Sequence, residues 1–226
     1  MKQAVRATRC RKAITLGFAS LLAMLPLAVV AEAPGGAGPD PATPAFTMQA
    51  FMIGANPFYA GEHGAPFPVT LYMQGDSTRM DFSGPNGQRG VMLHDGAAGK
   101  GLLISLDDGI VVPMESPGLA DLLVDPEDPC AFSGYRCRPV EPRTVAGKSM
   151  PGWRYRGADG RGPGGTSEGE FWIDPSRGVV VAYRGLRDGW DRPYELHAIS
   201  ITYGQLPAAI FDAPQVVDLD AGDAPG

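Results

Sequence analysis

The stretch "GDSTRMDFSGPNGQRGVMLHDG", from Gly75 to Gly96, decides the fold. Its glycines and arginines suit either a phosphate-binding loop or a β-hairpin. A phosphate-binding loop needs its glycines between a strand and a helix, so that backbone N–H groups converge on the anion. Here "GPNG" lies between two alternating segments, Arg79 to Ser83 and Gly90 to His94. The stretch therefore predicts a hairpin with its turn at Pro85-Asn86-Gly87. Arg79 and Asp81, on one face of the first strand, are expected to form a charge pair.

The same alternation, with a period of two, recurs along the chain and predicts further strands. Turn signals separate them, at Asp107-Asp108-Gly109 and in "DPSRG" (174–178). Only Ser116 to Glu127 has a helical pattern, with a Ser cap, an early Pro and three leucines at helical spacing. The predicted fold is mainly β, an antiparallel sheet of about seven to nine strands with one or two short helices. Besides the opening hairpin, the predicted strands lie in "PVTLYMQG" (68–75), "GLLISLDDGIVVPM" (101–114), "GWRYRGADG" (152–160), "EGEFWIDPSRGVVVAYRG" (168–185) and "RPYELHAISITYG" (192–204).

Composition divides the chain into four segments. Residues 1–31 combine a basic start with an apolar run and small residues, which is typical of a cleaved signal peptide. The alternative is a permanent membrane anchor, because the run approaches spanning length. Residues 32–45 are rich in Pro, Gly and Ala and are expected to be a disordered leader. Residues 46–215 are predicted as a single β domain, and 216–226 as a disordered acidic tail. The exported protein is expected to be periplasmic, without stable membrane insertion.

Charge limits the partners. The chain has 19 Lys and Arg against 25 Asp and Glu, and residues 1–31 hold five of the basic residues and no acidic one. Without them the balance is 14 − 25 = −11. A surface this acidic argues against nucleic acid and against anionic membrane as electrostatic partners.

Two cysteines remain after the predicted signal, Cys130 and Cys137. An exported protein meets oxidising surroundings, so a structural disulfide between them is expected. A redox-active pair would need C-x-x-C spacing at a helix start, and six residues separate these two.

No catalytic or metal-binding pattern emerges, so the protein is predicted not to be an enzyme and to need no cofactor or metal. His63, His94 and His197 are isolated in sequence, without the spacing that places two ligands on one helix. An acid–base role for His94-Asp95 is the alternative to a solvated histidine at a strand end. The methionines are scattered singly, which favours core filling over copper binding.

The segment "RGADGRGPGGTSEGE" (156–170) is longer than a hairpin turn needs. Long loops are either functional or merely flexible. Arg154, Arg156 and Arg161 are therefore candidate contacts for an anionic headgroup. The alternative is a mobile, solvated loop flanked by arginines.

Three stretches carry a family resemblance: "VTLYMQGDSTRMDF", "FWIDPSRGVVVAYRG" and the closing "AISITYGQLPAAIFDAP". In order and pattern they resemble the bacterial lipoprotein-carrier superfamily, the LolA- and LolB-like periplasmic proteins. The resemblance implies a strongly curved, unclosed antiparallel sheet, a half-barrel, whose concave apolar face accepts acyl chains.

Two functions follow as hypotheses. The first is a non-catalytic periplasmic carrier or sensor that holds a lipid or a lipoprotein acyl chain in the hollow of the sheet. Its expected apolar lining is Leu71, Met73, Met80, Phe82, Val181 and Tyr183. The second is an interaction module with a self-filled core that binds another envelope protein. The two differ in whether the concave face is hollow or packed.

Overall fold

The structure is a computed structural model that describes residues 44–54, 65–84, 87–96, 98–114, 119–134 and 136–215. The predicted signal peptide (1–31) and acidic tail (216–226) lie outside the described residues, as do nearly all of the predicted leader and His63. The described part of the predicted domain 46–215 forms one sheet.

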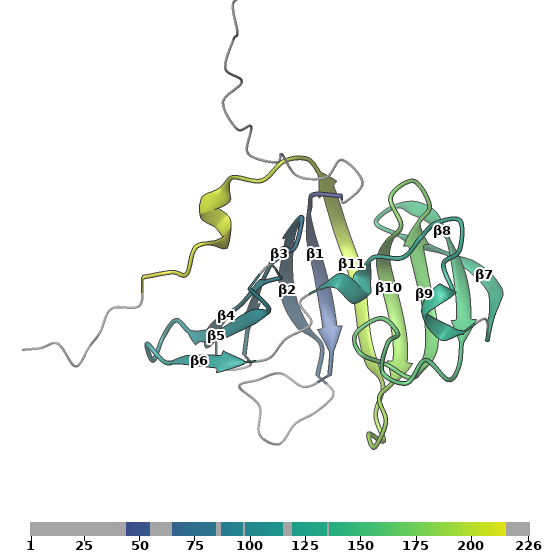
Figure 1. Ribbon diagram of the computed structural model, residues 1–226, viewed down its shortest axis with the longest axis horizontal. Helices are drawn as coiled ribbons and strands as arrows, with labels where there is room; N and C mark the ends of the chain where they lie inside the picture. The colour runs from purple at the N-terminus through teal and green to yellow at the C-terminus, as the bar shows by residue number, and fades with distance from the viewer. Residues whose placement is uncertain are drawn as a thin grey trace, which may run out of the picture. The chain divides into compact units, whose positions relative to one another are not determined.

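The sheet has eleven antiparallel strands in the order β6-β5-β4-β3-β2-β1-β11-β10-β9-β8-β7. β1 therefore lies beside β11, while every other neighbouring pair is consecutive in sequence (Figure 1). The strands are β1 (Phe46–Ile53), β2 (Phe67–Gln74), β3 (Ser77–Ser83), β4 (Arg89–Asp95), β5 (Lys100–Ser105), β6 (Val111–Met114), β7 (Cys137–Val145), β8 (Lys148–Tyr155), β9 (Glu168–Asp174), β10 (Val179–Leu186) and β11 (Tyr194–Tyr203).

The sheet is unclosed, because β6 and β7 are its two edges. Its second half curls, since β7 contacts β11 although three strands lie between them in the sheet. The side chain of Trp172 on β9 crosses β8 as well, and its Nε1 donates to the carbonyl oxygen of Glu141 on β7 at 3.1 Å. The predicted curved, open antiparallel sheet is thus present.

The opening stretch of the sequence is the β3–β4 hairpin, as predicted. Leu93 lies opposite Arg79 across the ladder, and the Gly84 N–H donates to Gln88 at 2.7 Å to close the turn. Gly87 has φ of 78°, a conformation that glycine adopts without strain. Arg79 and Asp81 form the expected pair, at 2.6 Å. Pro85 and Asn86 lie outside the described residues.

The prediction of seven to nine strands was too low, because the sequence reading missed β1 and β7. β7 contains Pro139 and Pro142, which remove backbone donors and make a segment look like a loop. The two prolines are tolerated because β7 is an edge strand with a bulge between Val140 and Arg143. β1 directly follows the Pro/Gly-rich leader, and its place at the centre of the sheet depends on pairing with β11 near the other end of the chain.

The helix predicted over Ser116–Glu127 is also wrong for residues 119–127, the part that the structure describes. Only a 3₁₀ turn, η1 (Ala120–Leu122), forms there within the described residues. The backbone instead bonds to the start of β10, because the Val124 N–H donates to the Gly178 carbonyl oxygen at 2.9 Å. This anchors Leu122, which is buried. Two further 3₁₀ turns are η2 (Ala131–Ser133) and η3 (Ala208–Phe211).

One face of the sheet carries the main core and is called the core face here. Phe46, Met48 and Leu71 are its fully buried residues on β1 and β2, and Phe171 and Tyr183 extend it to β9 and β10. The other face of β4 and β5 carries a small separate cluster of Val91, Leu93 and Ile104. Alternation along each strand therefore places the two clusters on opposite sides of the sheet.

Candidate functional site

The residues predicted to line a ligand cavity lie mostly on the core face. Leu71 lies opposite Met80, and Phe82 opposite Val69, so the β2 and β3 candidates share this face. Met73 is on the same side of β2. Leu71 is 0%, Met73 3% and Phe82 3% exposed. Their contacts are with the chain's own atoms, and a ligand-lining role for them stays a prediction.

The two candidates on β10 are buried as well. Tyr183 lies opposite Phe171 and Leu196 in the core-face row, and burial raises its pKa. Val181 lies in a bulge between Val180 and Ala182 and is 0% exposed. Their role in ligand binding likewise stays a prediction.

The structure brings together two of the three predicted headgroup arginines and adds two more. Arg154 on β8 lies directly opposite Arg138 on β7. Two residues further along the same two segments, the Arg156 N–H donates to the Arg136 carbonyl oxygen at 3.1 Å, so these two residues are also paired. Residues two apart in a strand share a face. The four arginines thus form a two-by-two arrangement on one face of the β7–β8 edge, named here the arginine block.

The third candidate, Arg161, lies outside the arginine block. Its Nε donates to the carbonyl oxygen of Ala158 at 3.2 Å, within the glycine-rich loop. A headgroup contact by Arg154, Arg156 or Arg161 stays a prediction.

Alternation with buried neighbours directs the four side chains outward. Tyr155, between Arg154 and Arg156, is 0% exposed and stacks edge-on against Phe132 and Phe171 on the core side. Burial raises the pKa of Tyr155 to about 12. The arginines on either side of it must therefore point away from the core and into solvent, where all four are exposed.

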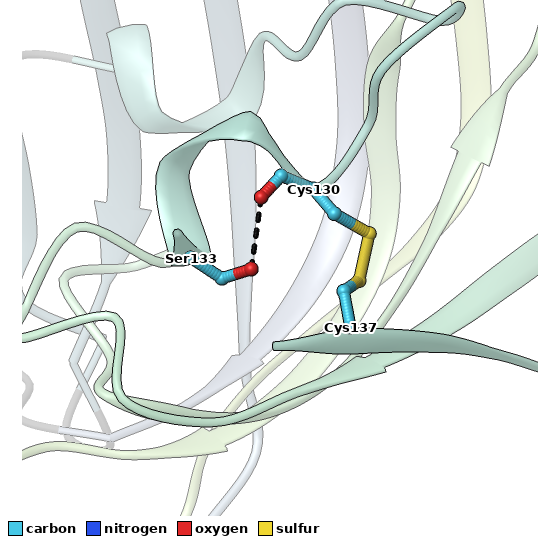
Figure 2. The surroundings of a disulfide bond; sticks show 3 residues. All are labelled: Cys130, Ser133 and Cys137. Atoms are coloured by element: carbon cyan, nitrogen blue, oxygen red, sulfur yellow. Dashed lines mark hydrogen bonds between the residues drawn. A yellow bond between two sulfur atoms is a disulfide. The ribbon is translucent and has the colours of Figure 1, made fainter. Parts of the chain in front are cut away.

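The disulfide fixes the start of β7. Cys137 stands between Arg136 and Arg138 and is joined to Cys130, with their Cα atoms 5.8 Å apart (Figure 2). The predicted pairing of the two cysteines is therefore present. Ser133 supports the connection, because its hydroxyl donates to the Cys130 carbonyl oxygen at 2.8 Å. The arginine block is thus built on an anchored edge of the sheet.

Few acidic groups offset the arginine block. Arg154 forms an ion pair with Glu170 on β9, and no ion pair of Arg136, Arg138 or Arg156 occurs among the residues that the structure describes. Like charges directly opposite each other in a sheet are destabilising. The arrangement therefore opposes stability.

Two open grooves meet at the arginine block. One, of about 480 Å³, is lined by Arg136, Cys137, Arg138, Arg154 and Arg156. The other, of about 470 Å³, shares Arg154 and Arg156 and continues over β9 and β10, past Glu168 and Glu170, to Leu186 and Pro193. Their size is in the range of small-ligand sites. The site is thus a continuous, charged surface depression.

The sequence reading missed Arg136 and Arg138. The visible signal was the repeated R-x-R spacing, in "RCR" (136–138) and "RYR" (154–156). On a strand this spacing places both arginines on one face. The first doublet lies at the start of β7, whose two prolines hide the strand pattern.

The glycine-rich loop is held against the body of the protein. The Asp121 carboxylate accepts the Gly165 N–H at 3.0 Å, and Arg187 donates from Nε to the Gly164 carbonyl oxygen at 2.8 Å. Ala158 and Thr166 in the loop are fully buried. Burial raises the pKa of Asp121 to about 6, against hydrogen bonds from Gly164 and Gly165 and the charge of Arg187, which lower it. These contacts contradict the alternative of a mobile, solvated loop.

The two described histidines, His94 on β4 and His197 on β11, are not part of the arginine block. Burial lowers the pKa of His197. The Nδ1 atoms of His94 and His197 are both buried without a hydrogen-bond partner. The described ranges contain no group of three or more His, Cys, Asp or Glu that could hold a metal ion. Nothing in this part of the chain indicates catalysis. In the same ranges, no helix has the length and apolar character to cross a membrane.

No family model matches the chain, and no curated protein matches it. Three solved structures illustrate what it resembles. An uncharacterized conserved protein from Thermus thermophilus is 10% identical, with a TM-score of 0.48 over 77% of this chain and 87% of that one. The MucA/MucB complex of Pseudomonas aeruginosa is 18% identical, with a TM-score of 0.44 over 77% of this chain and 58% of the other. A LolA superfamily protein from Nitrosomonas europaea is 11% identical, with a TM-score of 0.35 over 77% and 92% of the two chains.

These structures include a member of the superfamily that the sequence resembles. The chain spans just over half the length of the MucB chain that it matches.

Proposed function

We propose that this protein is a non-catalytic binding protein of the cell envelope that engages an anionic ligand or partner through the arginine block. The observation that carries the proposal is the placement of Arg138 opposite Arg154 beside the paired Arg136 and Arg156. Only Arg154 of the four has a carboxylate partner among the described residues. A bound anion would supply the missing countercharge.

The burial of the core face favours this proposal over an acyl chain in the hollow of the sheet. Leu71 and Val181 are 0% exposed, so an acyl chain at these positions would have to displace the protein's own side chains. Protein interiors are close-packed, and opening such a face costs the contacts that are lost. Of the two hypotheses from the sequence, an interaction module with a self-filled core is therefore the better supported.

The envelope location rests on two features of the chain. Residues 1–31 have the pattern of a signal peptide, and Cys130 and Cys137 lie at bonding distance. Disulfides form and persist in oxidising compartments such as the periplasm. We therefore place the protein in the periplasm.

A binding measurement with three anionic probes tests the function. The probes are pyrophosphate, vesicles containing phosphatidic acid, and a hexaglutamate peptide, each titrated at low ionic strength by calorimetry. At least one is expected to bind, and a variant combining Arg136→Gln, Arg138→Gln and Arg156→Gln is expected to lose that binding. Arg89→Gln is the matched control, because Arg89 is an exposed arginine on β4, far along the sheet order, paired with Asp107. Failure of every probe to bind would refute the proposal.

A further inference from the structure

From the geometry of the arginine block we infer that its ligand is a compact phosphate-bearing group, one or two phosphates in size. This inference rests on the proposed function, and it names the chemistry of the anion.

The dimensions of the arginine block match a small anion. Neighbouring strands lie about 5 Å apart, and residues two apart in a strand are separated by about 7 Å. The four arginines therefore originate from the corners of a small rectangle, and their side chains can converge on one anion above it. Guanidinium groups bind phosphate oxygens through paired hydrogen bonds in a fixed geometry. One phosphate can be held by two or three such groups.

Carboxylates limit the site on the β9 side. Glu170 already pairs with Arg154, and Glu168 lines the adjoining groove. A long anion lying across the sheet would pass over both carboxylates before it reached Arg184 on β10, and Arg184 is already paired with Glu195. Of the three arginines without a carboxylate partner in the described ranges, Arg136 and Arg138 lie on the outer edge, while Arg156 follows β8. An anion is therefore best placed over β7 and β8, with the rest of its molecule projecting past the edge.

An acidic peptide is the main alternative, since peptides often bind by adding a strand to an edge. The Arg156 N–H, just after β8, donates to the Arg136 carbonyl oxygen. The backbone groups of the alternate residues, Cys137 and Pro139, therefore face the open side of β7. Pro139 has no N–H to donate to an added strand, and Pro142 follows at the bulge. Prolines on an edge oppose strand addition. The edge thus disfavours a peptide ligand of this kind.

Extended polyanions such as nucleic acids are disfavoured by the field of the whole molecule. The chain carries 25 acidic and 19 basic residues, and without residues 1–31 the excess of acid is larger. Long-range attraction for a polyanion is therefore weak. Short-range contacts to a small group remain favourable, because the arginines are concentrated in one place.

The source of the phosphate is either a soluble phosphorylated compound or a lipid headgroup. The experiment measures the affinity of the full-length protein for inorganic phosphate and pyrophosphate in one arm. In a second arm it measures binding to phosphatidylcholine vesicles with and without phosphatidic acid. A hexaglutamate peptide, which carries carboxylates and no phosphate, forms the third arm. All arms are repeated with Arg138→Gln, Arg156→Gln, Arg138→Lys and the control Arg89→Gln.

The expected result is binding in the soluble or the vesicle arm that weakens about tenfold or more in Arg138→Gln and Arg156→Gln, as loss of a charged hydrogen bond predicts. Arg138→Lys keeps the charge without the paired geometry and should weaken binding to an intermediate degree. Arg89→Gln should bind like the wild type. Binding in the soluble arm assigns a soluble compound, and binding only to phosphatidic acid vesicles assigns a lipid headgroup.

Two outcomes separate the inference from the proposed function. If hexaglutamate binds and depends on Arg138 and Arg156 while no phosphate probe binds, the phosphate inference is overturned and the proposed function stands. If none of the probes binds, both are refuted.

Discussion

Arg138 lies directly opposite Arg154 in the β7–β8 ladder, with no carboxylate paired to Arg138 among the described residues. Two like charges in this position lower the stability of a sheet by up to about 1 kcal/mol. Substitution of Arg138 therefore tests whether this arginine lowers stability while it contributes to binding.

Arg138→Glu should stabilise the fold and abolish anion binding. It replaces a like-charge cross-strand pair with an opposite-charge pair, and we expect the free energy of unfolding to rise by about 0.5 kcal/mol. Urea denaturation measures the change, and calorimetry with the phosphate probes measures the loss of binding. Arg138→Gln, which removes the charge alone, should fall between the two in stability. A loss of stability in Arg138→Glu would show that the side chain has a structural role that the ladder does not reveal.

Removal of the disulfide should destabilise the protein and loosen the arginine block. The double variant Cys130→Ser and Cys137→Ser frees a short loop, which the chain-entropy model values at about 2–3 kcal/mol. Urea denaturation of the two proteins, with and without dithiothreitol, gives the difference. Reductant should lower the stability of the wild type and leave that of the double variant unchanged. Equal stabilities of the two proteins under oxidising conditions would contradict the prediction.

Much of the fold was predictable because alternation along a strand is a local signal. Leu71, Met73 and Phe82 fall on the buried face as their spacing indicates. The arginine block was not predictable in the same way, since it depends on which strands pair. The R-x-R spacing of Arg136 and Arg138 indicates a shared face only if the segment is a strand. The prolines of β7 make that segment look like a loop. The burial of the core face is likewise decided by packing between distant segments.

Gly164→Ala should be among the most destabilising glycine substitutions in the described chain. Gly164 has φ of 68°, and an added Cβ would meet the Tyr183 hydroxyl, which is itself buried. Backbone strain and overpacking together predict a loss of about 2 kcal/mol or more in the free energy of unfolding. Thermal and urea denaturation are the measurements.

Gly99→Ala is the matched control for this substitution. Gly99 has φ of 62°, but nothing lies within 4 Å of an added Cβ. Only the strain of the positive φ remains, and the free energy of unfolding is expected to fall by about 1 kcal/mol. Equal losses at the two positions would show that the glycine-rich loop can move away from Tyr183 at little cost.

Asp121 should make the stability of the protein depend on pH between about 4 and 6. Burial raises its pKa from 3.8 to about 6 in the folded protein. Between these values the folded protein binds a proton that the unfolded chain has released, so the free energy of unfolding falls as pH rises through this window. The pKa difference corresponds to about 2–3 kcal/mol at most. Above pH 6 the contribution of Asp121 is constant.

Asp121→Asn should flatten this part of the stability curve, because the amide retains an acceptor for the Gly165 N–H and cannot ionise. Urea denaturation at half-unit steps from pH 4 to 7 measures the slope. Asp107→Asn is the control. Hydrogen bonds from Arg89 lower the pKa of Asp107, so its titration changes the free energy of unfolding only below about pH 4. If Asp121→Asn and the wild type show the same slope between pH 4 and 6, then Asp121 titrates near its ordinary pKa. Its contact with the glycine-rich loop would then be more solvated than its burial indicates.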